Sequence, residues 1–448
     1  MKRIFYKTGW MLLLACVLTA CKSNDETVVI SETPKEQPEP KHELPKPESP
    51  QNNKSEDSLV VDMLPETRTI QLTQKQMAYA KKNNDFTFNL YRTIHKMQQE
   101  KKSNITSPLS VTYVLGMLND GADGETTEEI TKMLGFGDGD KKSLNEYCQA
   151  LITQAPLVDP SVTLEMANIV ATDKDVTLEP AYEQDMNNYY EAETASLDFG
   201  QPSSLDFLNG WCNEKSHGMI PKIIETLSKD TKLALMNAVY FKATWASKFD
   251  EKDTKDEVFT KADGTTRTIP MMHQKAEIMG GQNDLFTSIR LPYGSGDKYS
   301  MYVLLPAEGK TVDDIIGSLN NDYWQVNKWS EIFIADIKLP RFETKSEIVL
   351  NDMIAELGAP SMFDPLKADF KGVSSNYKEL FVSLLKQKAA IEVTEEGTKT
   401  SAVTIAMMDT MGGGTNKTME FHANRPFVYL IQEWDTQTIF FIGTFQGD

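Results

Sequence analysis

One stretch near the C-terminus decides how this chain is interpreted: T-E-E-G-T-K-T-S-A-V-T-I-A-M-M-D-T-M-G-G-G-T-N-K-T, residues 394–418. It connects two runs of strand-forming composition, residues 389–393 and 419–422. Connections of this length that lack an element of their own are uncommon, and most of them are functional. We therefore expect residues 394–418 to carry the activity of the protein.

The first half of this connection is competent to form a strand. If residues 398–408 became extended, alternate side chains would share one face. That face is uncharged, and most of its side chains are small: Thr398, Thr400, Ala402, Thr404, Ala406 and Met408. Lys399 falls on the opposite face, so no inward position would bury an unpaired charge and the segment is able to enter a sheet. The alternative is a surface loop that happens to be rich in Thr and Ala.

Composition places the chain among folded proteins and excludes several classes. The 448 residues are 40% hydrophobic, 9% aromatic and 25% charged, which is ordinary for a globular protein. Lys+Arg 46 against Asp+Glu 65 gives a net charge of -19, which would repel a nucleic acid. Four cysteines and five histidines show neither a disulfide framework nor metal-ligand spacing.

Residues 1–20 have the features of a signal peptide. A basic start with Lys2, Arg3 and Lys7 precedes an apolar run that is too short to span a membrane as a helix. The run ends in L-T-A-C at Cys21, which resembles a bacterial lipobox, where the cysteine becomes the lipid-modified N-terminus after cleavage. The alternative is a plain signal peptide followed by a chance cysteine. Acyl chains on Cys21 would anchor the protein to a membrane.

The rest of the chain divides into a tether and one domain. Residues 21–72 are rich in Pro, Glu, Lys, Ser and Asn, which predicts an extended tether; partner recognition by the prolines is the less favoured alternative. Residues 73–448 have globular composition without a linker, a long charge run or an internal repeat, and we expect a single domain there.

The order of periodic segments predicts the fold class. Helical spacing of apolar residues occurs over residues 75–99, 107–119 and 126–134. Runs rich in Val, Ile, Tyr and Phe predict strands over residues 233–242, 286–291, 299–305, 331–339, 389–393, 419–422, 427–432 and 438–445. Gly294-Ser-Gly296 between two of these runs predicts a hairpin turn. Helices first and strands later predict an α+β protein.

Catalytic and cofactor motifs are missing from the sequence. It contains no G-x-S-x-G elbow, Walker A loop or zincin motif. A calcium-loop-like run at Asp138 and Asp140 fails because Ser143 stands where glycine is required. We expect Cys148 and Cys212 to be buried apolar residues rather than nucleophiles. The sequence therefore predicts neither an enzyme nor a cofactor- or metal-binding protein.

The connection and its surroundings resemble the serpin family of serine protease inhibitors. E-E-G-T-K-T-S-A-V-T, residues 395–404, is similar to the reactive-centre-loop hinge of inhibitory serpins. Further family motifs follow in the family's order: N-I-T-S-P-L-S (104–110), G-A-D-G-E-T-T-E (121–128), L-M-N-A-V-Y-F-K (235–242), L-P-Y (291–293), L-P-R-F (339–342), R-P-F (425–427) and F-I-G (441–443). The resemblance spans residues 75–448.

The resemblance implies a helix-rich half packed on three β-sheets, with an exposed reactive-centre loop at about residues 394–418. A target protease would cut this loop and form a covalent acyl complex, and the cut hinge would insert into the central sheet and trap the protease. The implied hinge residues are Glu395, Glu396, Gly397, Thr398, Thr400, Ser401 and Ala402. The implied function is suicide-substrate inhibition of serine proteases; the alternative is a non-inhibitory serpin that binds a ligand or partner.

The resemblance also implies where the protease cuts. It places the reactive bond between Met411 and Gly412, with Thr410 as the neighbouring subsite residue, although counting back from Pro426 allows positions up to Thr415. Methionine suits proteases of the elastase, chymotrypsin or subtilisin type, and cysteine proteases stay open as targets.

A polar cluster is implied at the point where the sheet opens, formed by Ser107, Ser110, Asn237 and Gln387. The family usually has histidine at the last position; glutamine keeps the hydrogen-bonding capacity but not the titration. With the lipobox, the resemblance predicts a lipid-anchored, monomeric protein of the bacterial cell envelope, at the outer membrane and surface-exposed. The periplasmic face is the alternative. Its partners would be target proteases and the membrane, not nucleic acid.

Overall fold

A computed structural model describes residues 66–98, 101–137, 140–296, 298–328, 331–398 and 417–448. The predicted signal peptide, most of the tether and the outer part of the loop lie outside the described residues. The predicted site residues concerned are Cys21, Thr400, Ser401, Ala402, Thr410, Met411 and Gly412.

The longer helices lie in the first half of the described chain: α1 (Gln74–Met97), α2 (Pro108–Gly121), α3 (Gly124–Leu134), α4 (Lys141–Gln154), α5 (Pro180–Tyr190) and α6 (Pro202–Lys215). Three short helices follow in the second half: α7 (Val312–Ser318), α8 (Asn321–Asn327) and α9 (Asn351–Glu356). The three predicted helices correspond to α1, α2 and α3, with ends shifted by a few residues. α1 begins after a capping box at Thr73 and Gln76, and α2 begins with Pro108 after the N-cap Ser107.

Strands prevail in the second half. They are β1 (Asn104–Thr106), β2 (Val162–Asp173), β3 (Ala192–Leu197), β4 (Leu233–Thr244), β5 (Lys255–Thr260), β6 (Thr266–Gln282), β7 (Phe286–Pro292), β8 (Tyr299–Pro306), β9 (Glu331–Pro340), β10 (Phe342–Val349), β11 (Lys386–Val393), β12 (Gly397–Thr398), β13 (Thr418–His422), β14 (Phe427–Glu433) and β15 (Ile439–Phe445). Every predicted strand is present. The predicted hairpin turn joins β7 to β8, and Gly294 and Gly296 both have positive φ there.

The strands form three sheets. The largest has the order β1-β15-β14-β8-β7-β6-β9-β13, with β5 added to β6. A second sheet has the order β12-β4-β2-β3, and the third consists of β10 and β11. The α+β class is confirmed.

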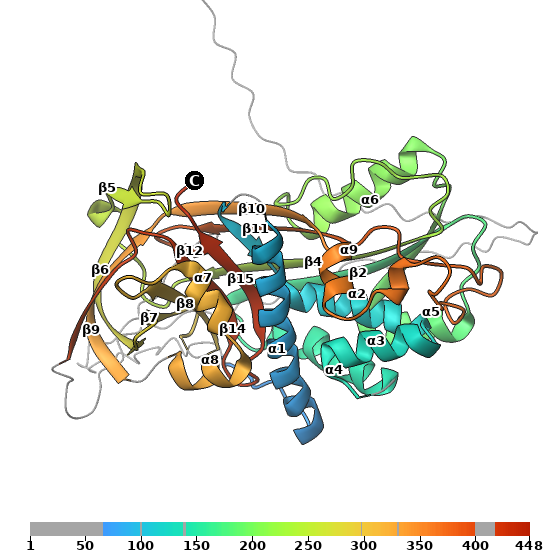
Figure 1. Ribbon diagram of the computed structural model, residues 1–448, viewed down its shortest axis with the longest axis horizontal. Helices are drawn as coiled ribbons and strands as arrows, with labels where there is room; N and C mark the ends of the chain where they lie inside the picture. Colours follow the sequence, from blue (N-terminus) through green and yellow to red (C-terminus); the bar gives the residue numbers. More distant parts are fainter. Residues whose placement is uncertain (1–65, 99–100, 138–139, 297, 329–330, 399–416) are drawn as a thin grey trace, which may run out of the picture. The chain divides into compact units, whose positions relative to one another are not determined.

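Helices cover both faces of the sheet that contains β4, as Figure 1 shows for α2 and α6. Alternate residues of β4 face opposite layers. Phe241 belongs to the main core together with Leu115 of α2, whereas Met236 packs in a separate cluster with Leu208 and Trp211 of α6. β4 is therefore fixed between two apolar layers.

The folded part begins before residue 73, which corrects the predicted boundary of the tether. Ile70 is only 4% exposed and belongs to the main core. The Arg68 amide donates to the Val158 carbonyl at 2.8 Å, and the Gln71 amide donates to the Gln154 side chain at 2.7 Å. Residues 66–72 were assigned to the tether because their composition is polar, but one apolar side chain and backbone hydrogen bonds hold them on the globular part.

Gly443 shows why the F-I-G motif requires glycine. It lies in β15 opposite Ile105 of β1, and a Cβ at this position would overlap the Asn104 carbonyl oxygen and the Tyr429 ring. The close approach lets the Tyr429 hydroxyl donate to that carbonyl at 3.3 Å.

We expect Gly443→Ala to lower the free energy of unfolding by about 1–3 kcal/mol, because the new methyl group has no space. Gly210→Ala in α6 is the matched control: its Cβ would meet nothing within 4 Å, so a gain of up to about 1 kcal/mol is expected. Urea unfolding followed by tryptophan fluorescence measures both. Equal stability of the two variants would show that Gly443 is not required sterically.

Candidate functional site

A gap between β4 and β11 is the most unusual feature of the fold. In the described part of the chain, β4 pairs with β2 and β12, β11 pairs with β10, and no ladder joins β4 to β11. β12 bridges the two strands only at one end, which we call the hinge end; the far end is where β4 and β11 begin. Beyond β12, neither strand has a strand partner on its facing edge among the described residues.

A tight turn at the hinge end leads from β11 into β12. Thr394 and Gly397 exchange two backbone hydrogen bonds of 2.9 and 3.1 Å across Glu395 and Glu396. Gly397 has φ 134°, and a Cβ there would overlap the Ala243 carbonyl of β4. Both the backbone conformation and the close approach require glycine at this position.

A buried carboxylate fixes this turn. The Glu395 side chain is 3% exposed and accepts hydrogen bonds from Arg341 Nε at 3.0 Å, Arg341 Nη2 at 2.5 Å and the Thr254 hydroxyl at 2.5 Å. Burial alone would raise the pKa of Glu395, but the hydrogen bonds from Arg341 and Thr254 outweigh it and hold this pKa below its ordinary value. The turn is thus held by a charged pair, to which Lys248 adds a second with Glu396.

Two aromatic side chains, Trp245 and Tyr293, pack against the hinge and form hydrogen bonds with it. Trp245 donates through its backbone amide to Glu396 and through its indole to Thr394, each at 2.9 Å. Its ring stacks on Tyr293 at 4.5 Å, and the Tyr293 hydroxyl lies 2.9 Å from Thr398 Oγ1. Thr398 is only 3% exposed.

The hinge residues from Glu395 to Thr398 are therefore not part of an exposed loop. Glu395, Gly397 and Thr398 are buried, and Gly397 and Thr398 already pair with β4. The predicted exposure is wrong for these residues because Gly397 permits a turn that carries the chain directly back into the sheet.

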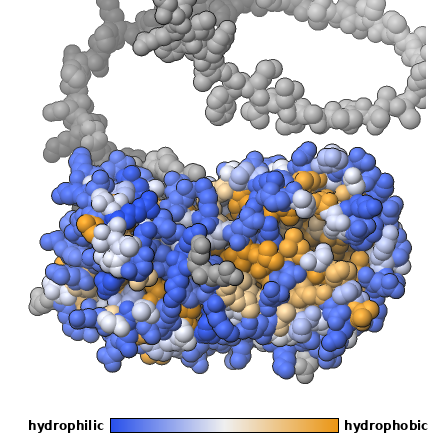
Figure 2. All heavy atoms as spheres, turned by 45° about the horizontal axis from the view of Figure 1, so that its top comes forward, coloured by the Kyte–Doolittle hydropathy of each residue, from blue (hydrophilic) through white to orange (hydrophobic). Residues whose placement is uncertain are grey.

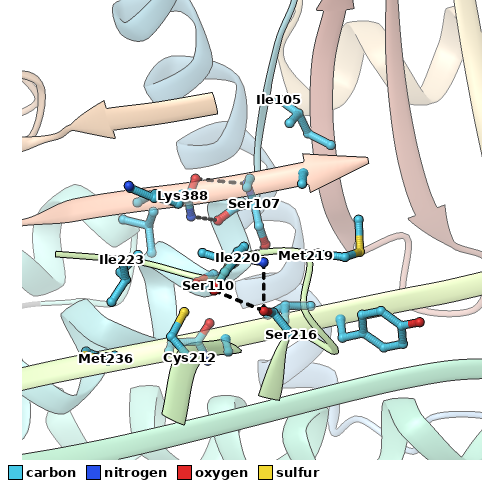
Figure 3. A pocket seen from close by; sticks show the side chains of 18 of the residues that line it. Ile105, Ser107, Ser110, Cys212, Ser216, Met219, Ile220, Ile223, Met236 and Lys388 are labelled. Carbon is cyan, nitrogen blue, oxygen red and sulfur yellow. Dashed lines mark hydrogen bonds between the residues drawn. The ribbon is translucent and has the colours of Figure 1, made fainter. Parts of the chain in front are cut away.

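The predicted polar cluster lines one cavity of about 80 Å³ in the gap (Figure 3). Gln387 accepts from the Ser107 amide at 3.1 Å and donates to the Ser107 carbonyl at 2.8 Å; it also bonds to Thr106. The Ser110 amide donates to the hydroxyl of the N-cap Ser107 at 3.4 Å. Three of the four predicted members thus form one hydrogen-bonded group on the β11 side.

Asn237 lies across the gap from that group. Its amide donates to Asn168 Oδ1 at 2.8 Å and to the Ala167 carbonyl at 3.3 Å, both on β2. Its side-chain oxygen is buried and has no hydrogen-bond partner among the described residues. A buried acceptor without a hydrogen bond lowers the stability of the fold, and a donor placed beside it would remove that cost.

A second, larger cavity of about 390 Å³ occupies the far end of the gap. Apolar side chains from β4, α2 and residues 370–385 make most of its wall, among them Val114, Leu118, Leu235, Phe370 and Leu385. On the face of the molecule that is turned forward in Figure 2, hydrophobic side chains gather in a hollow of the surface. An apolar hollow of this kind marks a binding surface more often than a chance exposure.

Several residues that hold the hinge were not predicted as site residues. Arg341 and Tyr293 lie within the motifs L-P-R-F and L-P-Y. These motifs indicate the family but do not show that the two side chains contact the hinge. Thr254 has no comparable signal, because it lies outside the quoted motifs and its partner Glu395 is distant in sequence.

Cys148 and Cys212 are buried, as predicted. Burial raises the pKa of Cys212 to about 11 and raises that of Cys148 further, so both are neutral thiols at pH 7. Within residues 66–448, excluding the undescribed gaps, no cluster of His, Cys, Asp and Glu has metal-binding geometry. None of the described helices has the length and apolar character needed to cross a membrane.

We expect Arg341→Gln to lower the free energy of unfolding at pH 7 by about 1–3 kcal/mol, because buried Glu395 loses two charge-assisted hydrogen bonds. The contact stabilises above the ordinary pKa of 4.5 and is lost as pH falls below it, since folding lowers the pKa of Glu395. The difference from wild type should therefore shrink on acidification. Lys345→Gln, which breaks a pair exposed by 64% and 55%, is the control, with an effect below about 0.5 kcal/mol.

Urea unfolding at a series of pH values measures both variants. A difference that stays constant from neutral pH down to below the ordinary pKa of Glu395 would show that the pair does not hold the hinge.

Comparison with known proteins agrees with this architecture. The family model described as serpin (serine protease inhibitor) matches residues 81–446. Leukocyte elastase inhibitor A of Mus musculus is 30% identical over 383 residues, covering 81% of this chain and 97% of that protein. Among solved structures, the native state of the thermophilic serpin tengpin superimposes with a TM-score of 0.75 at 26% identity, covering 86% of this chain and 97% of that one.

The structure of a hormone-binding globulin is also similar. Human thyroxine-binding globulin in complex with its hormone has a TM-score of 0.74 at 25% identity, over 83% of this chain and 98% of that one. The family match covers nearly all of the described chain, including the hinge, the polar cluster and both cavities. This protein therefore belongs to the serpin family.

Proposed function

We propose that this serpin is a suicide-substrate inhibitor of serine proteases of the elastase, chymotrypsin or subtilisin type. The observation that carries the proposal is the gap between β4 and β11, whose hinge end already holds Gly397 and Thr398 in register. Inhibition requires that a further strand be able to enter this gap. Serpins are generally not catalytic, and the inhibitor acts by trapping the catalytic step of another protein.

The register of β12 defines where an inserted strand would lie. Gly397 pairs with Thr244 of β4 and with Thr394 after β11, and Thr398 pairs with Ala243. Continued residue by residue, this register places Thr404 opposite Asn237 on one side and Gln387 on the other.

The same register decides which side chains would face the core. Because Thr398 faces the buried Tyr293 hydroxyl, alternate residues after it would face the core as well. Thr404 would meet the orphan oxygen of Asn237, and Met408, opposite Leu233, would reach the apolar cavity at the far end. The loop sequence therefore matches the gap at a polar position and at an apolar one.

The chemistry of the trap follows from acyl-enzyme formation. The protease nucleophile would attack the carbonyl carbon of Met411, an acyl bond to the protease would form, and the Met411–Gly412 peptide bond would break, with the Gly412 nitrogen leaving as an amine. Insertion of residues 399–408 at about 3.3 Å per residue would carry the attached protease about 30 Å along the sheet before water releases it. Cysteine proteases would be trapped through a thioester in the same way.

Lipidation at Cys21 would hold this inhibitor at a bacterial cell envelope. The support is the sequence alone: the basic and apolar leader, L-T-A-C and the proline-rich segment after it. We place the monomeric protein at the outer membrane, surface-exposed, where the tether would let the loop reach proteases outside the cell.

The second candidate function is a non-inhibitory serpin that binds a ligand or partner. The cavities in the gap and the likeness to a globulin solved with thyroxine favour it. The inward hinge positions argue for inhibition instead, because Thr398, Thr400 and Ala402 are small and uncharged.

The deciding experiment exposes the full chain to elastase-, chymotrypsin-, subtilisin-, trypsin- and papain-like proteases, followed by denaturing gels and mass spectrometry. We expect an SDS-stable complex and a released peptide that begins at Gly412. Cleavage of the loop without a stable complex across the whole panel would contradict inhibition and favour the ligand-binding alternative.

We expect Thr398→Arg to lower the yield of trapped protease by about tenfold, because a buried unpaired charge at this position costs several kcal/mol and would displace the hinge from β4, so that insertion no longer starts in register. The released protease should have cut the loop, so the variant acts as a substrate. Lys399→Arg is the matched control, since it keeps a cation on the outward face and should inhibit normally. Equal trapping by the two variants would rule out the inward assignment of Thr398.

We expect Thr404→Val to destabilise the loop-cut form by about 1–3 kcal/mol, because the Asn237 oxygen then stays unsatisfied. Thr400→Val is the matched control: the same substitution on the same face, but opposite apolar Phe241 and Ile391, should be neutral or stabilising. Denaturant unfolding of the two cut proteins gives the comparison. A larger loss for Thr400→Val would show that the register is shifted.

A further inference from the structure

We propose that the gap between β4 and β11 is also a binding site for a medium-chain carboxylate, an anionic amphiphile with one alkyl chain. The apolar far end would hold the chain, and a cationic group of side chains on β11 would hold the carboxylate. Binding itself does not depend on the inhibitory function; only its effect on inhibition rests on that proposal.

The far cavity suits an alkyl chain. Its volume of about 390 Å³ falls in the range of small-molecule pockets. It is continuous in its lining with the smaller cavity, because Val114, Ile223, Leu235, Met236 and Leu385 line both. The two cavities are therefore adjacent and together outline an elongated, mainly apolar channel, a shape that an extended chain fills better than a compact ring system does.

Positive charge gathers at the middle of this channel. Lys386 and Lys388 line it from β11, and both pair with Glu347. Lys388 also approaches Glu225 at 3.6 Å, which pairs with Lys222. In this group of ion pairs, the three ammonium groups of Lys222, Lys386 and Lys388 share the two carboxylates of Glu225 and Glu347, so the local charge is positive in a chain whose net charge is -19.

The charges also orient the ligand. The far cavity is lined by Asp230 and Glu379 as well as by Lys386 and by Lys232, which pairs with Asp173 at 3.3 Å, so it offers a carboxylate no excess of positive charge. The head group therefore belongs beside Lys388, whose side chain is 15% exposed, and the alkyl chain runs toward Leu118 and Phe370. Partial burial strengthens the contact between ammonium and carboxylate.

Bound ligand and inserted strand would occupy the same space. The register of β12 carries residues 400–408 along the channel, past Gln387 and into the far cavity. A ligand there would delay insertion and convert trapped complexes into cut, released inhibitor. The site would thus regulate the trap through the local supply of fatty carboxylates.

Titration calorimetry with dodecanoate below its micellar concentration tests the site on the full chain. We expect one saturable site on the uncut protein and none after a single cut within residues 399–416, because the inserted strand fills the channel. Lys388→Gln should weaken binding by about tenfold through loss of the charged contact. Lys345→Gln on neighbouring β10 makes the same charge change outside the channel and should bind like wild type.

Two further arms separate the parts of the proposal. Dodecanol should bind much more weakly than dodecanoate, and equal affinity would overturn the role of the cations. Ala234→Trp, which fills the wall of the far cavity, should abolish binding while leaving the circular dichroism spectrum unchanged. Undiminished binding in Ala234→Trp would overturn the site, whereas undiminished binding in the cut protein would show that the cut loop does not enter the gap.

If dodecanoate binds the uncut protein and Lys388→Gln and Ala234→Trp weaken that binding while no protease is trapped, the ligand site stands and the inhibitory function fails. If protease is trapped normally but dodecanoate does not bind, the reverse holds.

Discussion

In the described part of the chain, the missing ladder between two facing strands is the constraint on which the rest of this structure depends. Among these residues, β4 and β11 are joined through Gly397 and Thr398 at the hinge end, and no other strand pairs with their facing edges. Buried peptide groups without partners are unfavourable, and a strand that satisfies both edges would stabilise the fold. In the proposed mechanism, the cut loop would be that strand.

The hinge controls access to the gap between β4 and β11. The charged contact between Glu395 and Arg341 and the stacked pair of Trp245 and Tyr293 hold the first residues of the loop at the mouth of the gap. This arrangement fixes the register before any further residue enters, because Thr398 already faces the core. If the cut loop enters as proposed, the cavity at the far end would receive an apolar side chain and the Asn237 oxygen would receive a hydrogen bond. A fatty carboxylate would compete for the same space.

The family resemblance and eight of the strands could be predicted from the sequence, because family motifs and strand-forming composition are local signals. The sequence did not predict β1, β2, β3, β5, β6, β10 and β12; in β6, for example, Pro270 interrupts the strand pattern. It also could not place Asn237 apart from Gln387 or bury Glu395. The separation of Asn237 from Gln387 depends on the distance between β4 and β11. The burial of Glu395 depends on its contact with Arg341, which is distant in sequence. A local sequence pattern contains neither piece of information.

The most direct test of the central claim is the thermal unfolding of the full chain before and after a single cut within residues 399–416, with the position of the cut established by mass spectrometry. If the cut loop enters the gap and pairs both edges, the unfolding midpoint should rise by about 10 °C or more, as expected for a gain of several kcal/mol. An unchanged or lower midpoint after the cut would show that the gap does not accept the loop.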